Sequence, residues 1–171
     1  MKIIDNFLNE EEFDFILGTV SSEDSFPWYV TEQNFDKNNA DKNTSMNLQF
    51  FHMLYYHNSG GWMSDHASIL NPIIKRLNPF CLLKSKVNLL VNYNTHTKGN
   101  FHTDLDKESI SQTGILYLDT TNGPTEFADG SICHSIRNRF VEFATSTKHR
   151  SIRQVDKPQR RVININWIPY D

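Results

Sequence analysis

The chain has 171 residues, 38% of them hydrophobic, which is the size of one domain with a substantial buried core. Its formal net charge of −3 disfavours a protein that binds nucleic acid over a wide surface. No apolar run is long enough for a signal peptide or a membrane span, and the two cysteines, Cys81 and Cys133, form no CxxC motif. We therefore expect a cytoplasmic protein with free thiols.

The beginning of the chain predicts a short strand followed by a helix. Residues 3–7 form the strand, and Asn9 is placed to cap the helix with Glu12 as its capping-box partner. Apolar residues then recur at helical spacing, at Phe13, Ile16, Leu17 and Val20. One face of this helix is therefore expected to be buried.

The next part of the chain mixes aromatic extended segments, a polar stretch and a second helix. Residues 26–30 and 48–56 are rich in aromatic side chains, which favour strands. Between them, residues 31–47 are rich in Asn, Asp and Lys and predict a long surface loop. Asn71 is expected to cap a second helix with Pro at its first position, and Asn78 is expected to end it.

From Lys84 onward the pattern predicts β-structure. Alternating polarity begins at residues 87–93, and further strands are predicted at 113–119, 125–127, 140–144 and 162–168. Asn122-Gly123 and Asp129-Gly130 are turn signals between these strands. We expect one mainly β domain over 1–171, with helical and strand support over about 1–85 and a β-sandwich or barrel core over about 86–168.

A His-x-Asp pair, His102 and Asp104, is the first candidate for chemistry. On an extended strand the two side chains share a face, which suits a divalent metal held by two His and one carboxylate. Asp106 has the same parity, although we expect the chain to turn away after Asp104. For the second His, His134 has no distinguishing context, whereas His149 follows a strand and a small polar turn and precedes the last strand. His149 is therefore the better third ligand.

The last strand carries two adjacent arginines on opposite faces. Its more apolar parity is Arg161, Ile163, Ile165 and Trp167, and its other parity is Arg160, Val162, Asn164 and Asn166. If the more apolar parity faces inward, Arg161 is buried and Arg160 is outside. A buried Arg needs an anion, and a ligand carboxylate held in a fork satisfies it. Tyr117, on a neighbouring strand, is placed to donate a second hydrogen bond to that carboxylate.

Together, these features resemble the iron(II)- and 2-oxoglutarate-dependent dioxygenases, in particular their small prolyl-4-hydroxylase-like branch. That family has a strand with Tyr, His-x-Asp, a second strand with Tyr, a distal His, and a basic residue before a strand that ends in Trp. The matching residues here are Tyr93, His102, Asp104, Tyr117, His149, Arg161 and Trp167. The resemblance covers roughly residues 86–167. The interval from the distal His to the basic residue is slightly longer than usual, so spacing leaves Arg160 open.

The resemblance implies a double-stranded β-helix, that is, a cupin-like jelly roll. It implies Fe(II) bound by His102, Asp104 and His149. It also implies 2-oxoglutarate bound by Arg161, Tyr117 and Tyr93. With O₂, such an enzyme hydroxylates a substrate C–H bond and releases succinate and CO₂.

The substrate is left open by the sequence. A peptidyl prolyl or similar group is one candidate, and a free amino acid, another small molecule or a nucleobase is the alternative. A metal-binding jelly roll without turnover is a further alternative, but it has no need of a buried Arg beside a Tyr. Nucleic acid and membrane partners are not expected from the charge and hydropathy. Residues 31–47 and 95–100 are where we expect substrate selection.

Overall fold

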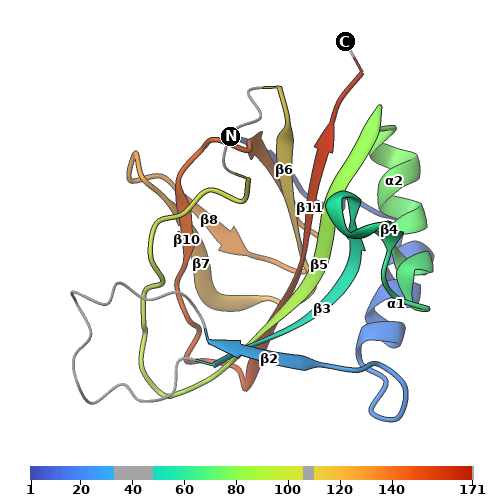
Figure 1. Cartoon of the computed structure of the whole chain (residues 1–171). Coiled ribbons are helices and arrows are strands. Elements are labelled where there is room, and N and C mark those ends of the chain that lie inside the picture. Colours follow the sequence, from blue (N-terminus) through green and yellow to red (C-terminus); the bar gives the residue numbers. More distant parts are fainter. Residues whose placement is uncertain (33–47, 106–109, 171) are drawn as a thin grey trace.

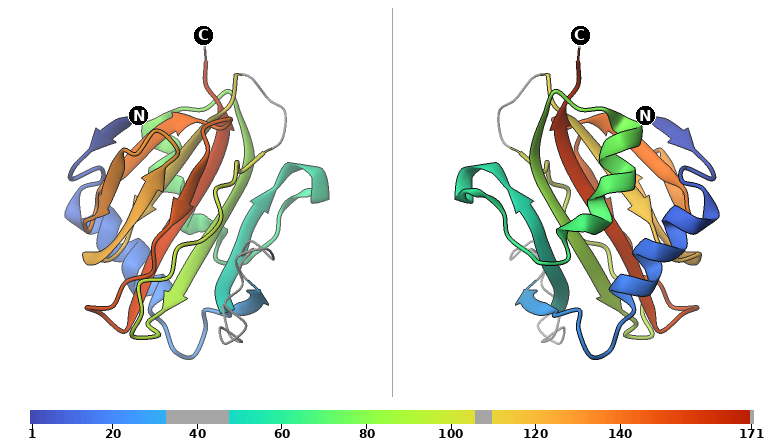
Figure 2. Two further views of the ribbon diagram at one scale, coloured as in Figure 1. Left: turned by 90° about the vertical axis from the view of Figure 1, so that its left-hand side faces the viewer. Right: turned by 90° about the vertical axis from the view of Figure 1, so that its right-hand side faces the viewer.

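A computed structural model describes residues 1–32, 48–105 and 110–170. Most of the predicted loop over 31–47, with its expected part in substrate selection, therefore lies outside the described residues, and so does Asp106. The described chain forms two antiparallel sheets that face each other, with two helices against the far side of the larger sheet (Figure 1, Figure 2). This arrangement confirms the predicted jelly roll.

The larger sheet has eight strands. Seven follow the order β1-β9-β6-β11-β5-β3-β2, and β4 pairs with β3 beside this path. Their bounds are β1 Lys2–Ile4, β2 Tyr29–Glu32, β3 Leu48–Tyr56, β4 Gly61–Trp62, β5 Cys81–Val91, β6 Gln112–Tyr117, β9 Phe140–Ala144 and β11 Gln159–Ile168. The smaller sheet has the order β10-β7-β8, with β7 Thr121–Phe127, β8 Ile132–Ser135 and β10 His149–Ser151. The helices are α1 Glu10–Val20 and α2 Asn71–Leu77, with short 3-10 turns η1 His57–Ser59 and η2 Ala67–Leu70.

Helix α1 forms as predicted. The Asn9 side chain accepts a hydrogen bond from the Glu12 backbone N–H at 2.8 Å, which satisfies one of the free donors at the helix start. Phe13, Ile16 and Val20 are buried against the sheet. The capping signal and the apolar stripe were therefore sufficient to place this helix.

Helix α2 begins differently from the prediction. Asn71 is already helical (φ −54°, ψ −46°), because the 3-10 turn η2 runs directly into α2, and Leu70 precedes it without a side-chain cap. A capping side chain needs a non-helical backbone, so the prediction of Asn71 as the cap is wrong. The predicted end is confirmed, since Asn78 adopts a left-handed conformation with φ 44°.

The central strands are buried on both faces. One apolar cluster fills the space between the helices and the larger sheet and includes Phe13, Ile73, Ile163, Ile165 and Trp167. A second cluster lies on the opposite face, between the two sheets, and includes Ile115, Tyr117, Phe127, Phe143 and Val162. The alternate residues of β11 therefore point into two different buried spaces. The more apolar set faces the helices, and the other set faces the smaller sheet.

Gly123 does not form the turn that Asn122-Gly123 predicted; it lies inside β7, where the pairing with β8 is irregular. A Cβ at Gly123 would lie 2.7 Å from both the Ile152 carbonyl oxygen and the Gln154 backbone nitrogen. Glycine is therefore required here by the close approach of a neighbouring backbone. The other predicted turn is confirmed, because Gly130 has φ 87° between β7 and β8.

Gly123→Ala is expected to lower the free energy of unfolding by about 2 kcal/mol, because backbone atoms cannot move aside for the added methyl group. Chemical denaturation measures this change. Gly18→Ala is the matched control, since it lies in α1 with nothing within 4 Å of the added Cβ. It should raise stability by about 0.5–1 kcal/mol. Equal effects at the two glycines would contradict the packing described for β7.

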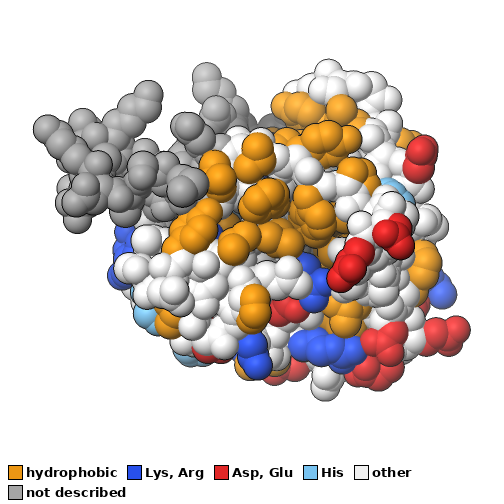
Figure 3. All heavy atoms as spheres, turned by 90° about the horizontal axis from the view of Figure 1, so that it is seen from below, with side chains coloured by type: hydrophobic (Ala, Val, Ile, Leu, Met, Phe, Trp, Pro, Cys, Tyr) orange, Lys and Arg blue, Asp and Glu red, His pale blue; other side chains and the backbone are white. Residues whose placement is uncertain are grey.

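Hydrophobic side chains gather on the underside of the molecule (Figure 3), the side on which β2 lies in Figure 1. Tyr29 and Val30 of this edge strand are 56% and 57% exposed.

Cys81 and Cys133 are free thiols, as predicted. Among the described helices, none is both long and apolar enough to cross a membrane.

Candidate metal and co-substrate site

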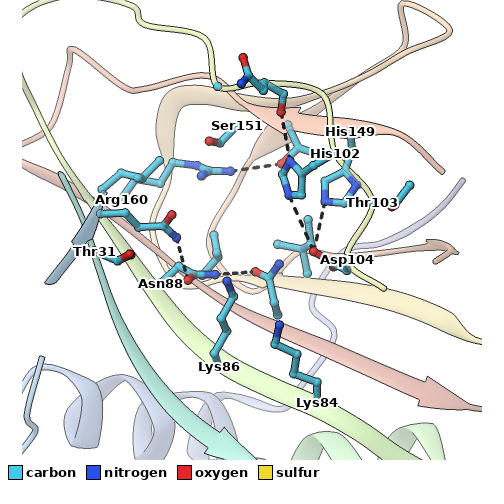
Figure 4. A pocket seen from close by; sticks show the side chains of 18 residues that line it. Thr31, Lys84, Lys86, Asn88, His102, Thr103, Asp104, His149, Ser151 and Arg160 are labelled. Atoms are coloured by element: carbon cyan, nitrogen blue, oxygen red, sulfur yellow. Dashed lines mark hydrogen bonds and ion pairs between the residues drawn. The ribbon is translucent and has the colours of Figure 1, made fainter. Parts of the chain in front are cut away.

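A cavity of about 360 Å³ opens between the two sheets (Figure 4). Its floor is the inner face of β3, β5, β6 and β11, and its roof comes from β7, β10 and the segment that leads to His102. The lining residues are Thr31, Gln49, Lys84, Lys86, Asn88, Leu90, Gly99, Asn100, His102, Thr103, Asp104, Ile115, Thr125, His149, Ser151, Arg160, Val162 and Asn164. The cavity is mostly polar, which is unusual for the space between two sheets.

His102, Asp104 and His149 come together at one side of this cavity. The His102 and His149 backbones pair, each N–H donating to the other's carbonyl at 3.0 Å. Residues paired in this way project their side chains to the same side of the sheet, and the two rings lie 4.6 Å apart. One ligand atom from each of the three side chains falls within 4.8 Å of the others. The predicted triad is therefore assembled, whereas His134 lies elsewhere, exposed on β8.

The hydrogen bonds of the two imidazoles determine which nitrogen faces the cavity. His102 Nδ1 lies 3.1 Å from the Asn100 carbonyl, and His149 Nδ1 lies 3.1 Å from the Thr147 carbonyl. A carbonyl only accepts, so each Nδ1 carries a proton, and Nε2 is the nitrogen through which each ring can bind a metal. These Nε2 atoms lie 3.8 and 3.9 Å from the same Asp104 oxygen. Two lone pairs and a carboxylate that converge in this way are the donor set for a cation.

Burial acts on His149, and hydrogen bonds orient Asp104. The His149 side chain is 4% exposed, and desolvation, followed by the influence of His102, lowers its pKa against an opposing effect of Asp104. Burial therefore favours the neutral imidazole, which is the form that binds a metal. Asp104 is 11% exposed, and its second carboxylate oxygen accepts a hydrogen bond from Asn166 Nδ2 at 3.2 Å. Asn166 also donates to Thr113 Oγ1 at 2.8 Å, so the carboxylate is held in a fixed orientation.

The orientation predicted for the two arginines is wrong. Arg160 lines the cavity and is 3% exposed. Arg161 lies on the other face, where it forms a two-point ion pair with Asp119 at 2.8 and 3.0 Å and donates to Ser21 Oγ. The physical reason is that β11 has two buried faces, and the helix-covered face takes the apolar residues. Arg161 therefore has its anion within the chain, and it does not meet the cavity.

Arg160 is buried in the cavity lining, and no carboxylate of the described residues forms an ion pair with it. Its Nη2 donates to Thr125 Oγ1 at 3.2 Å, and its guanidinium lies 5.4 Å from the centre of the Tyr117 ring. Its buried Nε has no hydrogen-bond partner, and no carboxylate pairs with it in the described part of the chain. Burial lowers its pKa against the opposing influence of Tyr117. An unpaired buried guanidinium is costly, so this group is arranged for an anion that enters the cavity.

The two predicted tyrosines are not in the cavity lining. Tyr117 is fully buried behind Thr125, to whose Oγ1 its hydroxyl donates at 2.8 Å, and burial raises its pKa. Thr125 Oγ1 thus accepts from both Tyr117 and Arg160, and its own O–H is left to point into the cavity. Tyr93 packs its ring 4.3 Å from the guanidinium carbon of Arg153. The structure therefore places Tyr117 next to the site and Tyr93 against a different arginine.

Several lining residues escaped the sequence reasoning. A chain of amides crosses the floor, in which Gln49 Nε2 donates to Asn88 Oδ1 and Asn88 Nδ2 donates to Asn164 Oδ1. Two lysines of β5, Lys84 and Lys86, lie beside it (Figure 4). The signal was present in the sequence, because Lys84, Lys86 and Asn88 share one parity of β5, as Arg160, Asn164 and Asn166 do on β11. A polar parity on two paired central strands indicates a binding cavity.

No family model matches the sequence, and no curated protein matches it significantly. Solved structures do match. An oxidoreductase of the 2OG-Fe(II) oxygenase family from Burkholderia pseudomallei gives a TM-score of 0.67 at 8% identity, over 94% of this chain and 79% of that one. A prolyl-4-hydroxylase from Pseudomonas putida gives 0.59 at 11% identity, over 99% and 92%.

A third similar structure is a prolyl hydroxylase from Trichoplax adhaerens, solved with a peptide fragment of the hypoxia inducible factor oxygen degradation domain. It gives a TM-score of 0.61 at 13% identity, over 98% of this chain and 83% of that one. At such identities the likeness concerns the fold. The chain thus has the double-stranded β-helix of the 2OG-Fe(II) oxygenases, prolyl hydroxylases included, which confirms at the level of the fold the resemblance inferred from the sequence.

Proposed function

We propose that this protein is an Fe(II)- and 2-oxoglutarate-dependent dioxygenase that hydroxylates a C–H bond of its substrate. One observation carries the proposal. A buried arginine that pairs with no described carboxylate and a convergent His-Asp-His donor set line the same cavity. A metal ion and a dicarboxylate satisfy both requirements at once.

The residues of the triad fit a ferrous ion. Two imidazole Nε2 atoms and one carboxylate oxygen converge from one side, which leaves the cavity side open for further ligands. Fe(II) bound there supplies the chelation of the keto acid and the activation of O₂ that oxidative decarboxylation requires. The Asn100 and Thr147 carbonyls hold the rings, and Asn166 holds the carboxylate.

Arg160 anchors the far carboxylate of 2-oxoglutarate in this proposal, in place of Arg161. A guanidinium binds a carboxylate through two parallel N–H donors. Thr125 donates its free O–H to the same carboxylate, while Tyr117 fixes Thr125 from behind. Arg160 is 3% exposed, and an ion pair is stronger in such a buried place than in water.

The substrate is a peptide or a small molecule. The Trichoplax relative in fold is solved with a peptide, while a cavity of about 360 Å³ is of a size that suits small ligands. The two free thiols fit a reducing cytoplasm, which is where we place this activity.

Succinate formation tests the proposal. Wild type supplied with Fe(II), O₂ and 2-oxoglutarate, without added substrate, should release succinate slowly, and His102→Ala should release none. His102 is 53% exposed at its side chain, so its loss should leave the fold intact, which circular dichroism checks. Equal succinate in both proteins would overturn the proposal. A wild type that binds iron and 2-oxoglutarate but yields no succinate would instead identify a metal-binding jelly roll without turnover.

A further inference from the structure

Two lysines of the cavity have no anionic partner in the part of the chain that the structure describes. Lys84 and Lys86 lie on the inner face of β5, and their side chains are directed into the cavity (Figure 4). Lys84 Nζ lies 5.4 Å from the centre of the Tyr56 ring, and no described carboxylate forms an ion pair with either lysine. Burial, followed by the charge of Lys84, lowers the pKa of Lys86 against the opposing influence of Asp104. Both lysines are half-buried, and partial burial of an unpaired ammonium is unfavourable.

The lysines and Arg160 occupy different ends of the cavity floor. Arg160 pairs in register with Leu90, whereas Lys86 pairs with Asn164 and Lys84 with Asn166. Leu90, which lies opposite Arg160, is four residues from Lys86 on β5. Lys86 is therefore about 13 Å from Arg160 along the strand direction. Asn166 holds Asp104 by a hydrogen bond, so the lysines lie at the Asp104 end. A dicarboxylate that reaches from the triad to Arg160 extends away from them.

The charges of the lining remain unbalanced after the co-substrate is placed. Lys84, Lys86 and Arg160 are cations, and Asp104 is the one carboxylate among the lining residues that the structure describes. In the proposed function Asp104 binds the metal, and the two charges of 2-oxoglutarate meet the metal and Arg160. The positive charge of Lys84 and Lys86 is then left for another ligand, in a chain whose net charge is −3.

We propose that the substrate carries a carboxylate that binds to Lys84 and Lys86, with the amides of Asn88 and Asn164 beside it. This inference rests on the proposed function and identifies the chemical class of the substrate. The anionic group is held at the Asp104 end of the cavity, so the C–H bond to be hydroxylated lies within a few bonds of it, close to the metal. The lysines thus determine specificity for organic acids over neutral compounds.

Acetate tests this site because it is the smallest carboxylate, and acetamide is its neutral match. The protein is loaded with Mn(II), which is paramagnetic and binds the same donor types as Fe(II), and is saturated with 2-oxoglutarate. Relaxation of the methyl protons then reports binding near the metal. Acetate should show saturable enhancement in wild type and acetamide should not. Lys86→Met and Lys84→Met should each weaken acetate binding roughly tenfold, while Lys75→Met, exposed on α2, should not.

The outcomes separate this inference from the proposed function. Binding of 2-oxoglutarate is measured in the same samples, and its absence in wild type overturns the proposed function. If 2-oxoglutarate binds but acetate does not, or if acetate binds equally to wild type and Lys86→Met, the lysine site is wrong. A free acid and an acidic peptide offer the same carboxylate. Displacement of acetate by N-acetylalanine assigns the free acid, and displacement only by Ac-Ala-Glu-Ala-NH₂ assigns the peptide.

Discussion

Arg160→Met should weaken 2-oxoglutarate binding at least about 30-fold without destabilising the apo protein. The affinity falls because the dicarboxylate loses a buried, charge-assisted partner, which costs about 2–5 kcal/mol. The stability stays constant or rises because methionine removes a buried cation that no described carboxylate balances. Calorimetric titration of 2-oxoglutarate into the Mn(II)-loaded protein measures the first effect, and chemical denaturation measures the second.

Arg161→Met is the matched control, and the opposite pattern is expected. This change leaves Asp119 without its ion pair, in a place where both side chains are largely buried, at 10% and 19% exposed. The free energy of unfolding should fall by about 3 kcal/mol, and 2-oxoglutarate affinity should remain within a factor of about three. If Arg161→Met abolished binding while Arg160→Met preserved it, the assignment of the co-substrate anchor would be wrong.

His149→Ala should lower Fe(II) or Mn(II) affinity by more than 100-fold, because it removes one of three ligand atoms, and even residues behind the ligands contribute 10–100-fold. The variant also loses ring contacts with Phe143 at 4.8 Å and Phe127 at 6.2 Å. Asp104→Asn is therefore compared with His149→Ala. This change keeps the shape of the side chain and its position beside Asn166, and it removes the charge. Both should fail to retain metal on a desalting column assayed by elemental analysis.

His134→Ala provides the control for the histidine variants. His134 is exposed on β8 and was the alternative third ligand in the sequence. It should retain metal and 2-oxoglutarate as wild type does. Metal loss in His134→Ala together with metal retention in His149→Ala would show that the triad assigned here is not the metal site.

Local signals were strong enough to predict much of the fold. The Asn9 cap, the bounds of β3 and β9 and the end of α2 at Asn78 each follow from a few neighbouring residues. The turn predicted at Asn122-Gly123 does not form. Gly123 lies in a strand, and glycine is required there by the close approach of the backbone of residues 152–154. No local pattern carries that information.

The grouping of His102, Asp104 and His149 was predictable, and the arginine that lines the cavity was not, for a physical reason. His102, Asp104 and His149 are distinctive residues whose strand order brings them together. The choice between Arg160 and Arg161 depended on the rule that the more apolar face of a strand points into the core. This rule holds for a strand with a single buried face. Strand β11 has two, and its polar parity lines the cavity. On two paired strands, polar residues can alternate with apolar ones on both strands. The face that carries the polar residues is then the better guide to a binding site.

The most direct measurement of the central claim is isotope tracing of the co-substrate reaction. Wild type turning over 2-oxoglutarate with Fe(II) under ¹⁸O₂ should yield succinate that carries one ¹⁸O atom, with CO₂ released in equal amount, and Asp104→Asn should yield neither. Mass spectrometry of the succinate gives the answer. Labelled succinate that depends on Asp104 is the predicted result. Succinate without ¹⁸O, or the same labelled yield from Asp104→Asn, would contradict an oxygenase centred on His102, Asp104 and His149.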